Sequence, residues 1–207
     1  MKEIEILVEI YDQIDKVKGV LNKFNYIGVK ETLDEYYYDP KREDLKPDKD
    51  NKLYKCLRLR RKDTDYYITY KDDVFDNGKW LYSNEYETKV ESIDIARSIL
   101  NKLGLIKFIE INNKKTIYRF DKYEITLEEV KDLGLFLEVE YCTSDDIDVK
   151  EIKKEIQKFI DGLNIKVSEE LDMGKPELYL RKNSIKIWYN IFNRRVYDID
   201  KRNWKWI

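Results

Sequence analysis

The chain has 207 residues, of which 42% are hydrophobic and 40% charged, and its formal net charge is -2. This composition supports one folded domain and excludes the global basic field that drives non-specific nucleic-acid binding. The absence of histidine excludes Ser-His-Asp and Cys-His catalytic arrangements and histidine-bound zinc.

The positions of the cysteines and the hydropathy of the chain indicate the cellular compartment in which the protein resides. Cys56 and Cys142 lie far apart, which favours neither a disulfide framework nor a cysteine-rich metal site. The N-terminal segment carries charges within its apolar run, and no stretch approaches the roughly 18 consecutive apolar residues of a membrane-spanning helix. We therefore expect a cytoplasmic protein that does not enter a membrane.

The first elements follow from changes in hydrophobic period. Residues 2–10 alternate strictly, which predicts a strand with apolar residues on one face and mostly glutamates on the other. Asp12 or Asp15 is expected to cap a helix that ends near residues 25–28. A second strand is expected over residues 33–39.

The middle of the chain indicates antiparallel strands. Residues 40–51 combine two prolines with many charges, which is typical of a solvated loop. Three strands are then expected over 54–61, 65–71 and 80–90. A helix should begin after Ser92 and close at Gly104. Its apolar face would consist of Ile95, Ile99 and Leu103.

Three further strands are expected over residues 114–120, 122–130 and 135–142, followed by a helix from Asp148 to Leu163. Strand sets separated by helices predict an α+β protein. The favoured arrangement is a single antiparallel barrel or curved sheet with helices packed outside.

Charges on the expected strands are sorted by sign. The acidic group consists of Glu3, Glu5, Glu128, Glu138 and Glu140, and the basic group of Arg58, Arg60 and Lys71. Carboxylates clustered inside a barrel suit Mg²⁺ or Mn²⁺, and arginines beside them suit a polyphosphate. An external lattice of salt bridges is the alternative, and spacing alone leaves both open.

Seven segments follow one another in a specific order and spacing: EIEIL, DEYYYD, LRLRR, YITYK, NEYET, KKTIYRF and ITLEEVKDLGLFLEVEY. Together they resemble the CYTH superfamily, also called triphosphate tunnel metalloenzymes. The resemblance spans about residues 2–181 and implies a tunnel-forming, eight-stranded antiparallel β-barrel with flanking helices. The corresponding domain is expected over residues 1–181.

The resemblance also implies roles for charged residues. Mg²⁺ or Mn²⁺ would be held by Glu3, Glu5, Glu128, Glu138 and Glu140. Phosphate oxygens would be bound by Arg58, Arg60, Lys71 and Lys115. The residues expected to be catalytic are Glu5, Lys71 and Glu138.

Three positions depart from the family pattern. Leu7 stands where the family has a lysine, Ser83 where a basic residue is usual, and Leu135 where an acidic or amide residue is common. An isobutyl group cannot hold a phosphate. These changes imply fewer cations around a triphosphate, a substrate with fewer phosphates, or impaired catalysis.

Residues 182–207 form an aromatic and basic extension containing Trp188, Trp204 and Trp206. Such a segment can dock on the barrel or a second subunit, stack on nucleic-acid bases, or lie at a membrane surface. We favour docking on the barrel or on a second subunit. In one functional form of this hypothesis, the docked extension covers one mouth of the tunnel.

The family resemblance implies an enzyme that acts on a nucleotide or other organic triphosphate. A class IV adenylyl cyclase-like lyase that converts ATP into cyclic AMP and pyrophosphate is the first hypothesis. A triphosphatase acting on thiamine triphosphate or tripolyphosphate is the second. A diverged barrel that binds or processes another nucleotide-derived ligand is the third. We expect neither a nucleic-acid nor a membrane partner, and a homodimer stays open.

Overall fold

The computed structural model describes residues 1–183, 185, 195–198 and 203–206. The strands are β1 (Lys2–Glu9), β2 (Asn25–Tyr38), β3 (Lys55–Lys62), β4 (Asp65–Asp76), β5 (Lys79–Val90), β6 (Ile106–Phe120), β7 (Tyr123–Val130), β8 (Gly134–Thr143), β9 (Arg195–Asp198) and β10 (Asn203–Trp206). The helices are α1 (Ile14–Leu21), α2 (Ile93–Lys102), α3 (Val149–Asp161) and α4 (Lys175–Lys182), with a 3-10 turn over Glu43–Leu45.

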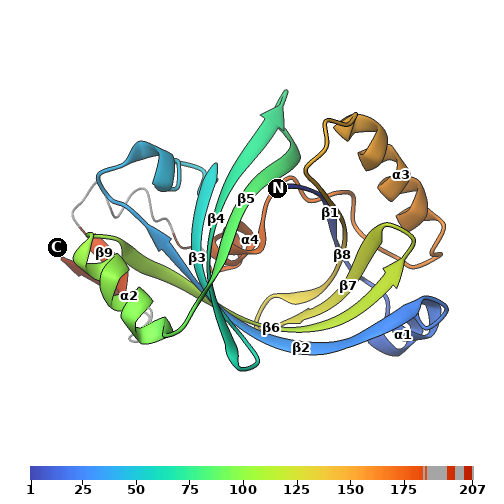
Figure 1. Cartoon of the computed structure of the whole chain (residues 1–207), viewed down its shortest axis with the longest axis horizontal. Coiled ribbons are helices and arrows are strands. Elements are labelled where there is room, and N and C mark those ends of the chain that lie inside the picture. Colours follow the sequence, from blue (N-terminus) through green and yellow to red (C-terminus); the bar gives the residue numbers. More distant parts are fainter. Residues whose placement is uncertain (184, 186–194, 199–202, 207) are drawn as a thin grey trace. The chain divides into compact units, whose positions relative to one another are not determined.

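Eight strands close into an antiparallel barrel in the order β1-β5-β4-β3-β2-β6-β7-β8, which confirms the predicted fold (Figure 1). The chain divides into two compact units. Unit 1 comprises residues 1–31, 73–84 and 113–172, and unit 2 comprises residues 32–72, 85–112 and 173–207. Each unit is described below by itself.

In unit 1, the apolar face of β1 packs beneath helices. Ile4, Ile6 and Val8 are fully buried in a core that includes residues of α1 and α3. Helix α3 packs along β1 and β8 (Figure 1). Its start agrees with the predicted one, because Asp148 is the N-cap residue and its side chain accepts hydrogen bonds from two backbone N–H groups. The other face of β1, which carries Glu3, therefore points away from this core.

In unit 2, the apolar faces of the strands pack beneath α2. The helix contributes Ala96 and Leu100 to a core with Leu57 and Leu59 of β3. Ser92 caps the helix as predicted, but the predicted apolar face is wrong. Ile95, Ile99 and Leu103 are 62%, 54% and 69% exposed. Two neighbouring stripes of α2 are apolar, and periodicity does not show which one meets the sheet.

Several predicted boundaries were wrong. Neither Asp12 nor Asp15 caps α1, which begins after Gln13. Helix α1 ends at Leu21, because β2 starts at Asn25 rather than at residue 33. Alternating apolar residues extend β2 and β6 beyond the segments expected for them.

The turn between β4 and β5 is shorter than expected. Strand β4 continues to Asp76, and Asn77 and Gly78 have φ angles of 50° and 83°. This conformation suits the tight hairpin turns that favour Asn-Gly pairs.

Helix α4 was missed by sequence analysis. Gly174 is its N-cap residue. Glu177 accepts hydrogen bonds from the backbone N–H groups of Gly174 and of Leu53, the latter 3.0 Å away. A single helical turn of apolar residues, including the fully buried Leu180, was too short a pattern to predict it.

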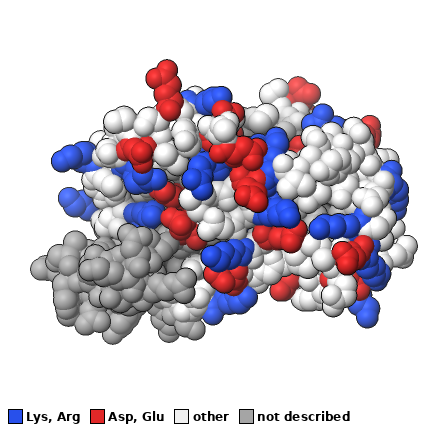
Figure 2. All heavy atoms as spheres, turned by 90° about the horizontal axis from the view of Figure 1, so that it is seen from below, with Lys and Arg blue, Asp and Glu red and all other residues white. Residues whose placement is uncertain are grey.

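In the C-terminal extension, β9 and β10 pair as a two-stranded antiparallel sheet. The predicted docking of the extension rests on side chains such as Trp188, which lie outside the described residues. Among the residues described, no helix is both long and apolar enough to cross a membrane. Basic and acidic side chains of the described residues are interspersed on the face drawn in Figure 2.

An ion pair between the buried Glu35 and the partly exposed Arg97 attaches α2 to β2 in unit 2. Arg97 donates to both carboxylate oxygens of Glu35 at 3.0 and 2.6 Å, and the Tyr37 hydroxyl donates to the same carboxylate at 2.7 Å. Burial acts to raise the pKa of Glu35, but these hydrogen bonds hold it below its usual value. The pair therefore contributes stability above the unfolded pKa of Glu35, and that stability is lost as pH falls through the lowered pKa.

Replacing Arg97 with methionine should lower the free energy of unfolding by about 3 kcal/mol, because the Glu35 charge would remain buried without its guanidinium. Urea unfolding measures this value. The matched control is Arg42→Met, which breaks an exposed pair with Asp44 and should cost less than about 1 kcal/mol. Equal losses in the two variants would contradict the assigned importance of the pair between Glu35 and Arg97.

Candidate metal centre and arginine network

The register of unit 1 brings glutamates together on the side of the sheet that faces away from the helices. Strand β1 pairs with β8, which places Glu5 opposite Glu140, and β1 also carries Glu3 two residues before Glu5. Glu3 and Glu5 are buried. Residues two apart share a face of a strand, so the three carboxylates converge.

These three glutamates form the carboxylate cluster. Glu3, Glu5 and Glu140 each offer a carboxylate oxygen, and these oxygens lie within 4.8 Å of one another. Hard oxygen donors at this spacing fit Mg²⁺ or Mn²⁺. The cluster could therefore hold a divalent cation.

Electrostatics within unit 1 support this fit. Burial raises the pKa of Glu140 well above its usual value, and the charges of Glu3, Glu138 and Glu5 raise it further. A carboxyl with a raised folded-state pKa contributes stability that is fully present below its unfolded pKa. This stability is lost as pH rises through the folded pKa. A bound divalent cation would offset the repulsion.

Replacing Glu140 with glutamine should stabilise the metal-free chain at pH 8 by up to about 1 kcal/mol, because a like-charged cross-strand pair is removed. The expected rise in Tm is about 2–4 °C. Thermal unfolding in EDTA should show this gain at pH 8 and little gain at pH 4, where Glu140 is protonated. A variant that is less stable than the native chain at pH 8 would contradict the assigned repulsion.

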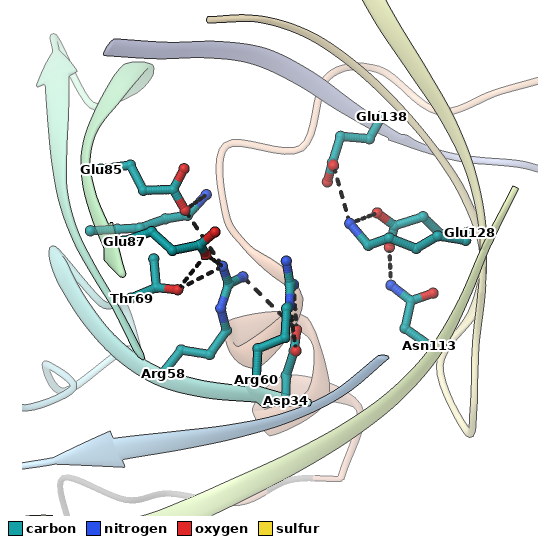
Figure 3. Close-up of polar contacts among 11 residues, drawn as sticks. Asp34, Arg58, Arg60, Thr69, Glu85, Glu87, Asn113, Glu128 and Glu138 are labelled. Atoms are coloured by element: carbon teal, nitrogen blue, oxygen red, sulfur yellow. Dashed lines mark hydrogen bonds and ion pairs between the residues drawn. The ribbon is translucent and has the colours of Figure 1, made fainter. Parts of the chain in front are cut away.

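The other two predicted metal ligands contact a lysine. Lys115 Nζ lies 2.8 Å from Glu128 and 3.5 Å from Glu138, and Asn113 donates a hydrogen bond to Glu128 (Figure 3). The group that fits a cation therefore contains three of the five predicted ligands. Lys115, predicted to bind phosphate, lies between two carboxylates.

In unit 2, the predicted phosphate-binding cations belong to a network of ion pairs, called the arginine network here. Arg60 donates to both oxygens of Asp34 at 2.7 and 2.6 Å in a bidentate pair (Figure 3). Cross-strand pairing explains the contact, because Asp34 of β2 lies opposite Arg60 of β3. Asp34 is buried, so it fixes the direction of the Arg60 guanidinium.

Arg58 lies two residues before Arg60, on the same face of β3. Its Nη2 atom lies 3.3 Å from the Thr69 hydroxyl and 3.5 Å from both Glu85 and Glu87 (Figure 3). Burial and the charge of Arg60 act to lower the pKa of Arg58, but nearby carboxylates raise it above its usual value. The guanidinium is therefore held in its charged form.

Lys71 completes the network, with its Nζ atom 3.7 Å from Glu85. Among the contacts described, three cations thus face three carboxylates. The members are Arg58, Arg60, Lys71, Asp34, Glu85 and Glu87. A phosphate bound here would have to compete with carboxylates that orient the cations.

Two of the three departures from the family pattern, Leu7 and Ser83, are buried, and Leu135 is partly buried. Leu7 is 1% exposed and lies opposite Glu138, on the same face of β1 as Glu5. Ser83 is fully buried, and its hydroxyl donates to Asp73 at 2.6 Å. Leu135 lies opposite Glu129. Leu7 therefore places an apolar group beside the carboxylate cluster.

Sequence analysis missed five polar members of these two sites. They are Asp34, Thr69, Glu85, Glu87 and Asn113. The segments DEYYYD and NEYET contain three of them, and alternation within each segment was an available signal. Their partners could not be chosen without the register of the neighbouring strands.

Comparisons with known proteins bear on the whole barrel. The family model of the CYTH domain matches residues 1–171. A Methanocaldococcus jannaschii protein named "Putative adenylate cyclase MJ0240" is 31% identical over 183 residues, which cover 87% of this chain and 99% of that protein.

Solved structures share the fold. PH1819 of Pyrococcus horikoshii is 23% identical and superposes with a TM-score of 0.73, covering 87% of this chain and 99% of its own. The Hippeastrum protein HpAC1, described as a "putative adenylyl cyclase" with a dominant triphosphatase activity, is 15% identical. Its TM-score is 0.59, and the match covers 86% of this chain and 95% of that one.

Proposed function

Since this chain belongs to the CYTH family, we propose that it is a metal-dependent enzyme that acts on a nucleotide or other organic triphosphate. The observation that carries the proposal is the carboxylate cluster of Glu3, Glu5 and Glu140, whose oxygens lie within 4.8 Å of one another. Three converging carboxylates are unfavourable without a cation, and Mg²⁺ or Mn²⁺ is the natural occupant.

When bound, the cation would neutralise phosphate charge and orient the attacking oxygen. Glu3, Glu5 and Glu140 would hold it, with Glu128 and Glu138 supplying further negative charge in unit 1. Phosphate oxygens would be bound by Arg58, Arg60, Lys71 and Lys115. No histidine is required, because these charged groups can position and stabilise the reacting phosphate.

Two arginines suit planar, bidentate contacts with phosphate oxygens. Asp34 holds Arg60 in one orientation, and Glu85 contacts both Arg58 and Lys71. We assign these carboxylates a positioning role. The catalytic assignments are Glu5, Lys71 and Glu138. Glu5 would hold the cation and Glu138 would add negative charge beside it, whereas the Lys71 ammonium would stabilise charge at the reacting phosphate.

A cyclase reaction like that of class IV adenylyl cyclases is the first candidate. The 3′-hydroxyl oxygen of ATP would form a bond to the α-phosphorus, its proton would leave to solvent or a nearby base, and pyrophosphate would depart. The name of the relative from Methanocaldococcus jannaschii supports this candidate.

A triphosphatase is the second candidate. Water would attack the terminal phosphorus of thiamine triphosphate or tripolyphosphate, and the remaining diphosphate would leave. The activity described for the Hippeastrum protein supports this candidate. Leu7 and Ser83 favour a third candidate, in which the barrel binds or processes another nucleotide-derived ligand with fewer phosphates.

Product analysis by mass spectrometry tests these candidates, with ATP, thiamine triphosphate and tripolyphosphate offered separately in Mg²⁺ or Mn²⁺. Cyclic AMP with pyrophosphate supports the cyclase, and orthophosphate supports the triphosphatase. The same mixtures with EDTA are the control and should give no product. Absence of product from every triphosphate would overturn both of the first two candidates and leave the third.

We also propose a cytoplasmic location. Cys56 and Cys142 lie far apart in the sequence and form no CxxC motif, which suits a reducing compartment. Fractionation of cells followed by detection of the chain tests this placement, and recovery outside the cytoplasm would contradict it.

A further inference from the structure

The first half of β2 is an exposed strand edge in unit 1. Strand β3 pairs with β2 from Thr32, which lies opposite Lys62, and β3 ends at Lys62. Residues 25–31 of β2 therefore continue past the end of β3 toward α1 (Figure 1). The barrel order gives β2 only β3 and β6 as neighbours among the described strands, so one edge of residues 25–31 has no strand beside it.

This segment, called the β2 edge here, is also unusually apolar for an exposed strand. Tyr26, Ile27 and Val29 are 57%, 45% and 46% exposed. Soluble proteins commonly protect such edges with charges, prolines or bulges, because an open apolar edge can pair with another strand. Ile27 and Val29 lie on one face of the strand, where side chains of a second, edge-paired strand would lie beside them.

Gly28 lies between these two residues. A Cβ atom placed on it would meet no atom within 4 Å, so the face of the strand at Gly28 is open. Glycine within a strand often marks a place where another backbone approaches closely.

We propose that the β2 edge pairs antiparallel with the β2 edge of a second copy of this chain, about a two-fold axis at Gly28. This register places Ile27 opposite Val29 of the second copy, and Val29 opposite its Ile27. Tyr26 lies opposite Lys30, a favourable aromatic-cation pair. Asn25 lies opposite Glu31, so no like charges meet.

The sequence of the β2 edge is thus complementary to itself, which selects a second copy rather than an unrelated strand as the occupant. Backbone hydrogen bonds across the axis would extend the sheet of each copy. The four apolar side chains of the two copies would form one cluster. A symmetric contact of this kind closes as a dimer.

Analytical ultracentrifugation of the full chain over a range of concentrations tests the pairing. A species of twice the 25.2 kDa chain mass is expected to grow with concentration. Ile27→Lys or Val29→Glu alone should abolish it, because each buries one unpaired charge. The double variant should restore the dimer, because each new lysine then lies opposite a new glutamate.

Ile95→Lys is the matched control, since Ile95 is also exposed but lies on α2. It should leave the dimer unchanged. A monomer at all concentrations, a dimer insensitive to both single changes, or a double variant that stays monomeric would overturn the proposal. Circular dichroism should show native folding in every variant, because the substituted side chains are exposed.

Discussion

Replacing Glu5 with glutamine is expected to lower kcat/KM for the triphosphate substrate by at least about 100-fold in Mg²⁺. Changes in groups that merely support metal ligands already cost about 10–100-fold. Glu5 lies at the centre of the carboxylate cluster, two residues from Glu3 and opposite Glu140. An amide keeps the size of the side chain but removes the charge that a divalent cation requires.

Steady-state kinetics at several Mg²⁺ concentrations measure this effect. The Mg²⁺ concentration that gives half of the maximal rate should be higher for the Glu5 variant than for the native chain. Glu129→Gln is the matched control, because Glu129 lies on β7 next to Glu128 but points to the other face of the strand. If the Glu5 variant had an unchanged kcat/KM and an unchanged Mg²⁺ requirement, the assignment of Glu5 as a metal ligand would be contradicted.

Replacing Arg60 with alanine should lower kcat/KM by about 10²–10³-fold, a loss typical of removing one group that stabilises charge in the transition state. Arg60 is the cation with the best-defined orientation, since Asp34 holds it through two hydrogen bonds. Arg60→Lys keeps the charge but loses the planar fork, so it should recover only part of the activity.

The neighbouring Arg61 supplies the control. It is exposed, and Arg61→Ala removes the same charge from the opposite face of β3. Activity should stay within about twofold of the native value. Thermal unfolding separates catalysis from folding, because Arg60→Ala also leaves Asp34 without its bidentate partner. Equal kinetic losses for the Arg60 and Arg61 variants would contradict a specific phosphate contact.

Alternation in the sequence predicted which faces of the strands carry charge. In β1, the apolar residues Ile4, Ile6 and Val8 are buried beneath helices and the glutamates lie on the other face, as the period of two requires. The number of strands and the closed barrel were likewise predictable. The closure came from the family resemblance, because alternation alone does not distinguish a barrel from a curved sheet.

Partners within the candidate site could not be predicted in the same way. The pairing of Arg60 with Asp34 depends on the register of β2 against β3, which alternation leaves open by steps of two residues. Side-chain geometry also decides which acidic residues contact Lys115 and which belong to the carboxylate cluster. For α2, the choice between two apolar stripes depended on the shape of the sheet it covers.

A titration of Mn²⁺ into the full chain at pH 8, followed by electron paramagnetic resonance, tests the central claim that the carboxylate cluster binds a divalent cation. We expect saturable binding that Mg²⁺ displaces, and binding at least about 10-fold weaker in the Glu140→Gln variant. No saturable binding, or equal binding by the native chain and the Glu140→Gln variant, would contradict a metal site at Glu3, Glu5 and Glu140.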